Sequence, residues 1–198
     1  DSLKEYLFVF EQKKLPNTKK NFGNFSLINR VFQKCYLEDK NTKNNFETIV
    51  NQNDGVDYYR YLFFYIHFLI ENNNYEEAKK ITDNLDYLDL PLLISQGKKW
   101  IEDQKLEEFK KVFSCKNSND IVSEFFFLVA NLYLSQNNYE KSNFYLNISN
   151  YLNPKFSFNL SLLAENYYNE GDYKTTLKIL ENINKKNEFY HWFKLKKK

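Results

Sequence analysis

The repeating pattern of this chain is clearest in residues 123–156, which read SEFFFLVANLYLSQNNYEKSNFYLNISNYLNPKF. Apolar side chains recur there every three or four residues, which predicts two amphipathic helices separated by the polar turn SQNN at 135–138. Residues 157–188 repeat the pattern around the turn NEGD at 169–172, and Tyr139 and Tyr173, which follow the two turns, lie 34 residues apart. The chain is therefore predicted to contain helix pairs that recur at this period.

Weaker copies of the pattern precede these two segments. Residues 58–89 have a similar turn, and residues 90–122 and 25–52 are more degenerate pairs. We expect one domain over residues 1–198, made of about four to five helix pairs and truncated at both ends. In the clearest turns, Gly171 is expected to end a helix in the left-handed conformation, with Asp172 capping the next helix.

Alanine is rare in this chain, yet its three copies fall where two helices would need a small side chain to approach each other closely. Ala130 and Ala164 mark the same first-helix position one repeat apart, and Ala78 marks a second-helix position. A bulky side chain there would overpack the contact. The residues expected to pack the repeats are Ala78, Gly97, Ala130, Tyr133, Ser142, Ala164, Tyr167 and Thr176.

These positions give the chain its resemblance to the tetratricopeptide repeat (TPR), whose pattern is W-x2-L-G-x2-Y, then A-x3-F, then P. Ala130, Tyr133, Ser142, Leu146 and Pro154 occupy matching places. The resemblance is closest over 124–183 and weaker back to residue 58. Together with a composition typical of a low-GC genome, it suggests a fragment of a longer bacterial TPR protein.

The resemblance implies an all-α, right-handed superhelical solenoid of antiparallel helix pairs, with degenerate pairs at the N-terminal end. It also implies a non-catalytic scaffold that binds a peptide or a partner helix in a concave groove lined by the first helices. The groove is expected to carry Phe63, His67, Phe127, Asn131, Leu134, Ser161, Glu165 and Tyr168. The alternative is that several of these side chains complete the core between layers.

Signals for chemistry are scarce. The two histidines, His67 and His191, have no companions at metal-ligand spacing, and the four glycines are isolated, so no catalytic residue, metal or cofactor is expected. The formal net charge of +2 gives no basic field for nucleic acid. The apolar run 61–70 is too short to cross a bilayer. Cys35 and Cys115, read as isolated thiols, favour a reducing, cytoplasmic compartment, although a disulfide and a periplasmic location stay open.

The partner protein cannot be identified from this pattern, and three alternatives stay open. The chain could be an accessory repeat segment of a larger enzyme or of a secretion or envelope assembly. It could be a helical-repeat RNA binder that uses the lysine-rich terminus 194–198, or its groove could close on a second copy of the same chain. Residues 189–195 are expected to begin another helix, either a further repeat or a terminal cap.

Overall fold

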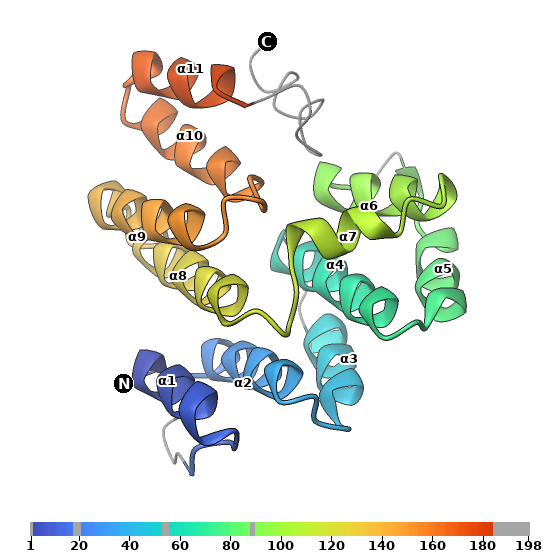
Figure 1. Ribbon diagram of the computed structural model, residues 1–198. Helices are drawn as coiled ribbons and strands as arrows, with labels where there is room; N and C mark the ends of the chain where they lie inside the picture. Colours follow the sequence, from blue (N-terminus) through green and yellow to red (C-terminus); the bar gives the residue numbers. More distant parts are fainter. Residues whose placement is uncertain (1, 18–20, 53–55, 88–89, 184–198) are drawn as a thin grey trace. The chain divides into compact units, whose positions relative to one another are not determined.

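The computed structural model describes residues 2–17, 21–52, 56–87 and 90–183, which form eleven α-helices and no strand (Figure 1). The predicted all-α class is therefore confirmed for this part of the chain. The described residues group into two compact units, unit 1 (Asp1–Ile121) and unit 2 (Val122–Lys198), where the sequence suggests a single domain. The boundary falls near the start of helix α8 (Ser118–Leu134), where no linker-like change in composition marks it.

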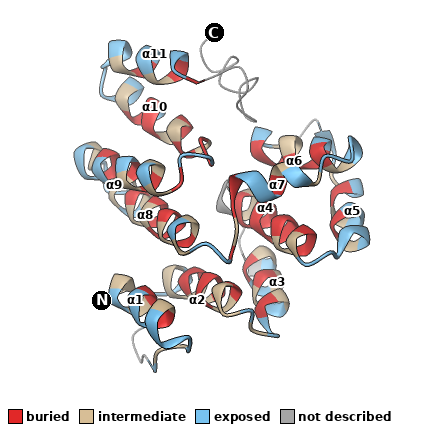
Figure 2. Cartoon of the chain, in the orientation of Figure 1, coloured by how far each residue is buried: buried red, intermediate tan, exposed pale blue. Residues whose placement is uncertain are grey.

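Unit 1 is arranged around one helix, α4. Its helices are α1 (Ser2–Gln12), α2 (Asn24–Tyr36), α3 (Thr42–Gln52), α4 (Val56–Glu71), α5 (Tyr75–Asp83), α6 (Leu92–Glu102) and α7 (Glu107–Val112). Helix α4 contacts α3, α5, α6 and α7. Residues 60–67 of this helix are all buried (Figure 2), as expected for a helix that is apolar on nearly every side.

The core of unit 1 is largely aromatic. The Phe64 ring lies 5.3 Å from the Phe32 ring of α2 and 4.7 Å from the Phe113 ring, measured between centroids. Phe32 also meets Phe46 of α3 edge to face at 6.0 Å. Tilted and edge-to-face contacts of this kind stabilise a core beyond the apolar area that they bury. These rings are thus accounted for by packing within the unit.

Unit 2 contains most of α8 (Ser118–Leu134), with α9 (Tyr139–Leu152), α10 (Asn159–Asn169) and α11 (Tyr173–Glu181). Ala130, Leu146 and Leu163 lie in its buried core, and α10 contacts both α9 and α11. Polar contacts accompany this packing, because Asn166 Nδ2 donates to Ser142 Oγ at 2.9 Å. Small side chains at these contacts thus leave room for close packing and for a hydrogen bond between helices.

The side chains expected to pack the repeats are buried or half-buried in their own units. Ala78, Ala130, Ser142, Ala164 and Thr176 are buried, whereas Tyr133 and Tyr167 are half-buried. Gly97 is also buried, and a Cβ added to it would lie 3.3 Å from Phe63 Cδ2 and from Phe109 Cζ. Phe109 is large although the repeat pattern favours a small side chain at this second-helix position. It is accommodated because Gly97, which faces it, carries no side chain.

Five turns between successive helices share one backbone geometry. Each has a residue in the left-handed conformation, with φ of 53°, 62°, 57°, 56° and 81° at Glu38, Asn73, Gln104, Asn137 and Gly171. Each also has the paired hydrogen bonds of a Schellman motif, for example Asn138 N to Tyr133 O at 3.0 Å and Asn137 N to Leu134 O at 2.8 Å. The five residues are spaced 31 to 35 positions apart. The period predicted from the sequence thus appears in the backbone itself.

The last of these turns confirms both expectations for its residues. Gly171 has a positive φ, and Asp172 Oδ1 accepts a hydrogen bond from the backbone N–H of Thr175 at 3.0 Å. This bond and one from the Thr175 hydroxyl lower the pKa of Asp172. The carboxylate therefore satisfies one of the free N–H groups at the start of α11.

Replacing Gly171 by Ala is expected to lower the free energy of unfolding by about 1 kcal/mol, because a Cβ disfavours the left-handed conformation. A Cβ at this position would have no atom within 4 Å, so the effect should come from the backbone alone. Gly171→Asn is the matched control, since Asn73 and Asn137 occupy equivalent turns. Urea unfolding would measure both variants, and equal loss in the Ala and Asn proteins would contradict the explanation.

Candidate functional site

An open groove of about 700 Å³ lies in unit 1 among α3, α4 and α5. Each helix contributes one stripe of side chains at helical spacing, so three faces converge on the same space. The stripes are Glu47, Val50 and Asn51 from α3; Tyr58, Leu62 and Tyr65 from α4; and Glu76, Glu77, Lys80 and Ile81 from α5, with Asn84 directly after it. The groove combines an apolar surface with carboxylates.

Tyr65 links the two walls of this groove. Its hydroxyl lies 2.9 Å from Glu47 Oε1 on α3 and 3.3 Å from Glu77 Oε1 on α5. Lys43 extends the cluster, because its Nζ lies 2.7 Å from Glu77 Oε2. Burial and the two carboxylates raise the pKa of Tyr65, so its hydroxyl stays protonated as a donor. The Tyr65 hydroxyl has one proton and can donate it to only one of the two carboxylates at a time. The carboxylates of Glu47 and Glu77 therefore keep lone pairs that can accept further hydrogen bonds.

Two residues expected to line a groove, Phe63 and His67, are instead buried in the core of unit 1. The Phe63 ring stacks on Phe109 at 5.5 Å, and the His67 ring lies edge to face with Phe113 at 5.4 Å. Both side chains therefore point toward α6, α7 and the segment that follows them. The stripe of α4 that borders the groove is a different one and carries Tyr58, Leu62 and Tyr65, of which Leu62 and Tyr65 are themselves buried. The groove expectation is corrected for these two residues, which complete the core.

The other expected groove residues belong to unit 2 and differ widely in exposure. Phe127 and Ser161 are buried, Asn131 and Leu134 are half-buried, and Glu165 and Tyr168 are exposed. Asn131 Nδ2 donates to the Phe127 carbonyl at 2.9 Å, and the Tyr168 ring meets Tyr173 at 5.3 Å. Buried Phe127 and Ser161 are thus part of the packing, which leaves the exposed Glu165 and Tyr168 as surface residues of α10.

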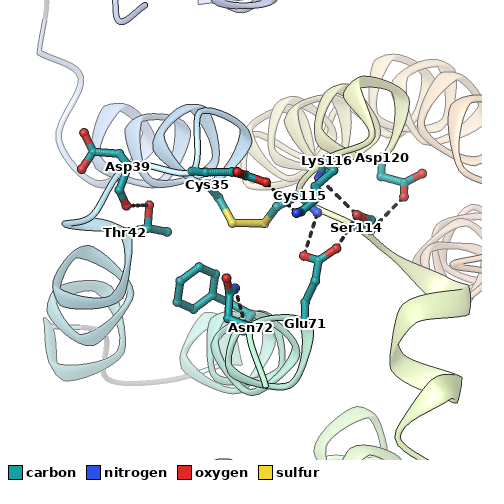
Figure 3. The surroundings of a disulfide bond; sticks show 11 residues. Cys35, Asp39, Thr42, Glu71, Asn72, Ser114, Cys115, Lys116 and Asp120 are labelled. Carbon is teal, nitrogen blue, oxygen red and sulfur yellow. Dashed lines mark hydrogen bonds and ion pairs between the residues drawn. A yellow bond between two sulfur atoms is a disulfide. The ribbon is translucent and has the colours of Figure 1, made fainter. Parts of the chain in front are cut away.

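Cys35 and Cys115 form a disulfide within unit 1, with their Cα atoms 5.5 Å apart (Figure 3). It joins the last turn of α2 to the segment between α7 and α8. Glu71, at the end of α4, lies beside it and accepts hydrogen bonds from the Ser114 hydroxyl at 2.5 Å and the Cys115 N–H at 3.4 Å. The expectation of a reducing compartment from two isolated thiols therefore loses its basis, because the cysteines are paired.

In the described ranges, no three His, Cys, Asp or Glu side chains are grouped so that they could hold a metal ion. None of the helices in those ranges is long and apolar enough to cross a membrane. The expected helix at 189–195, His191 and the lysines of 194–198 lie outside the described residues. Comparison with protein-family models, with curated proteins and with solved structures finds no significant match.

Reasoning from the sequence missed the Tyr65 cluster, although one signal for it was present. Lys43 of α3 forms an ion pair with Glu77 of α5. The two residues are 34 positions apart, which is also the spacing of Tyr139 and Tyr173. Lys43 and Glu77 occupy the first turns of α3 and α5. Opposite charges separated by one period of the sequence pattern were therefore a signal for this contact. The disulfide had no comparable signal.

Proposed function

We propose that the chain is a TPR-like, non-catalytic protein-binding scaffold, built as a right-handed solenoid of antiparallel helix pairs. The observation that carries this proposal is the geometry shared by five turns, with its 31 to 35 residue spacing. Turns that recur at such a period are the signature of stacked helix pairs.

The α3–α4–α5 groove is the proposed binding site. Its floor comes from α4, which is fixed by packing on several sides, and its walls from α3 and α5, which Tyr65 and the Lys43–Glu77 pair connect. A surface held in this way loses little conformational entropy when a ligand binds. A peptide or partner helix that places apolar side chains on half-buried Val50 and Ile81 suits the lining of the groove.

Selection from a displayed library of random 12-residue peptides would test this proposal. The enriched peptides are expected to bind the parent chain and to lose about tenfold in affinity for Ile81→Ser, because half-buried Ile81 supplies apolar contact in the groove. Leu177→Ser removes a comparable, exposed side chain from α11 and is expected to change nothing. Enriched peptides that bind Ile81→Ser as tightly as the parent, or a library without enrichment, would contradict the proposal.

A further inference from the structure

We propose that the occupant of the α3–α4–α5 groove is a peptide segment in which apolar side chains alternate with Lys or Arg. This inference rests on the proposed function and adds the chemistry of the partner. It is carried by the distribution of charge around an apolar floor. The groove is lined by three carboxylates, from Glu47, Glu76 and Glu77, against the single ammonium of Lys80.

The apolar part of the occupant follows from the middle of the groove. Leu62 and Tyr65 of α4 form its floor but are themselves buried, so the apolar surface that an occupant can reach is mainly that of Val50 and Ile81 on the two walls. Val50 and Ile81 are half-buried, so an apolar side chain placed between them would remove their remaining surface from water. A strongly polar segment would leave these side chains wet and gain nothing from the floor.

The cationic part follows from the positions of the carboxylates. Glu47 and Glu77 lie on opposite walls, and both are within 3.3 Å of the Tyr65 hydroxyl, so a charge at this point meets two acceptors. Lys43 neutralises one oxygen of Glu77, while Glu76 adds a further exposed carboxylate on α5. A guanidinium or ammonium group beside Tyr65 would make charge-assisted hydrogen bonds to these carboxylates. An acidic segment would be repelled by the same groups.

The preference for a cationic segment is the reverse of what the formal charge of the whole chain, +2, would favour. Non-specific attraction by the net charge would favour an acidic peptide, whereas the groove favours a basic one. Tighter binding of a basic peptide therefore cannot come from the net charge and has to come from a local acidic surface.

The test uses two fluorescein-labelled 12-residue peptides with leucine at the same positions, one with Lys and the other with Glu at all the remaining positions. Fluorescence anisotropy with the full chain is expected to show at least about tenfold tighter binding of the Lys peptide. Glu47→Gln/Glu76→Gln should weaken that binding by about five- to tenfold, because each Gln keeps the side-chain shape and removes the charge. Glu107→Gln/Glu140→Gln, with the same charge change outside the groove, should have no effect.

The outcomes separate this inference from the proposed function. If the Glu peptide binds as tightly as the Lys peptide and Ile81→Ser weakens both, the groove binds peptides but the cationic occupant is wrong. If Ile81→Ser and Glu47→Gln/Glu76→Gln leave the binding of both peptides unchanged, or if neither peptide binds, both proposals fail. Circular dichroism of every variant would establish that its helices are intact. Salt should weaken binding of the Lys peptide to the parent chain, and much less to Glu47→Gln/Glu76→Gln. That result would support the role assigned to these two carboxylates.

Discussion

Removal of the Cys35–Cys115 disulfide is expected to lower the free energy of unfolding by roughly 4.5 kcal/mol. The bond joins residues 80 positions apart, and in the chain-entropy account a cross-link of that length stabilises a protein by about this amount. Single domains are stable by only about 5 to 15 kcal/mol, so the loss is a large part of the total. Unit 1 is expected to be marginal without its disulfide.

The surroundings of the bond indicate where the loss should be concentrated. Phe113, two residues before Cys115, packs against Phe32 of α2 and Phe64 of α4. Glu71 holds the same segment through Ser114 and the Cys115 N–H. These contacts remain when the disulfide is absent, so the segment should keep its native position in the folded state. The main effect should therefore be on the unfolded chain, which gains conformational freedom.

Urea unfolding of the parent with and without a dithiol reductant, and of Cys35→Ser/Cys115→Ser, would measure this loss. Trp100 is buried in unit 1, and in a Trp192→Phe background it is the single tryptophan that reports unfolding. Reductant should destabilise the parent and leave the double-serine variant unchanged. A shift below about 1 kcal/mol in the parent would rule out the expected stabilisation by this cross-link.

The helices and turns could be predicted from the sequence because their signals are local. The period-34 pattern predicts helices in residues 123–156 and 157–188, and the structure has helices over 118–152 and 159–181, interrupted by the turns. Gly171 and Asp172 have the conformation and cap that their residue types favour. Burial of Ala130 and Ala164 could also be predicted, because the 3.6-residue period places both on the apolar face of a helix.

The groove could not be located in the same way, because α4 is apolar on nearly every side. Phe63 and Leu62 are neighbours in an apolar run, and the pattern does not indicate which stripe packs against α6 and α7 and which borders the groove. Tertiary contacts decide this, chiefly the missing side chain at Gly97 that admits Phe63 and Phe109. The disulfide likewise depends on a contact between residues that are 80 positions apart in the sequence. Two isolated cysteines have no characteristic spacing from which this pairing could be predicted.

His67→Phe is expected to stabilise the folded chain by about 1 to 3 kcal/mol at pH 7, because it replaces an imidazole whose polar atoms are buried without a well-formed hydrogen bond. His67 is 1% exposed, and neither ring nitrogen makes a hydrogen bond of ordinary geometry in the described part of the chain, although backbone groups of Phe113 and Phe109 lie near the ring. Its surroundings are the rings of Phe109 and Phe113. A phenyl ring has a similar shape and no polar atom to desolvate.

The stability difference between parent and variant should widen in acid. Burial away from water lowers the pKa of His67 below its usual 6.5, an effect that the nearby Glu71 charge and the backbone groups of Phe113 and Phe109 only partly oppose. Between the folded-state pKa and 6.5, the unfolded chain binds a proton that the folded chain does not. The free energy of unfolding of the parent therefore falls as pH drops through this window, by up to about 1.4 kcal/mol per pH unit.

Urea unfolding of the parent and His67→Phe between pH 7.5 and 5 would measure both effects. Carboxylates titrate in both proteins, so the informative quantity is the difference between the two curves, which should grow as pH falls below 6.5 and level off at the folded-state pKa. His191→Phe is the control for the other histidine. A difference that stays constant from pH 7.5 to 5 would show that His67 has the same pKa in the folded and unfolded chain, whereas a difference that shrinks would mean that the folded state favours its charged form.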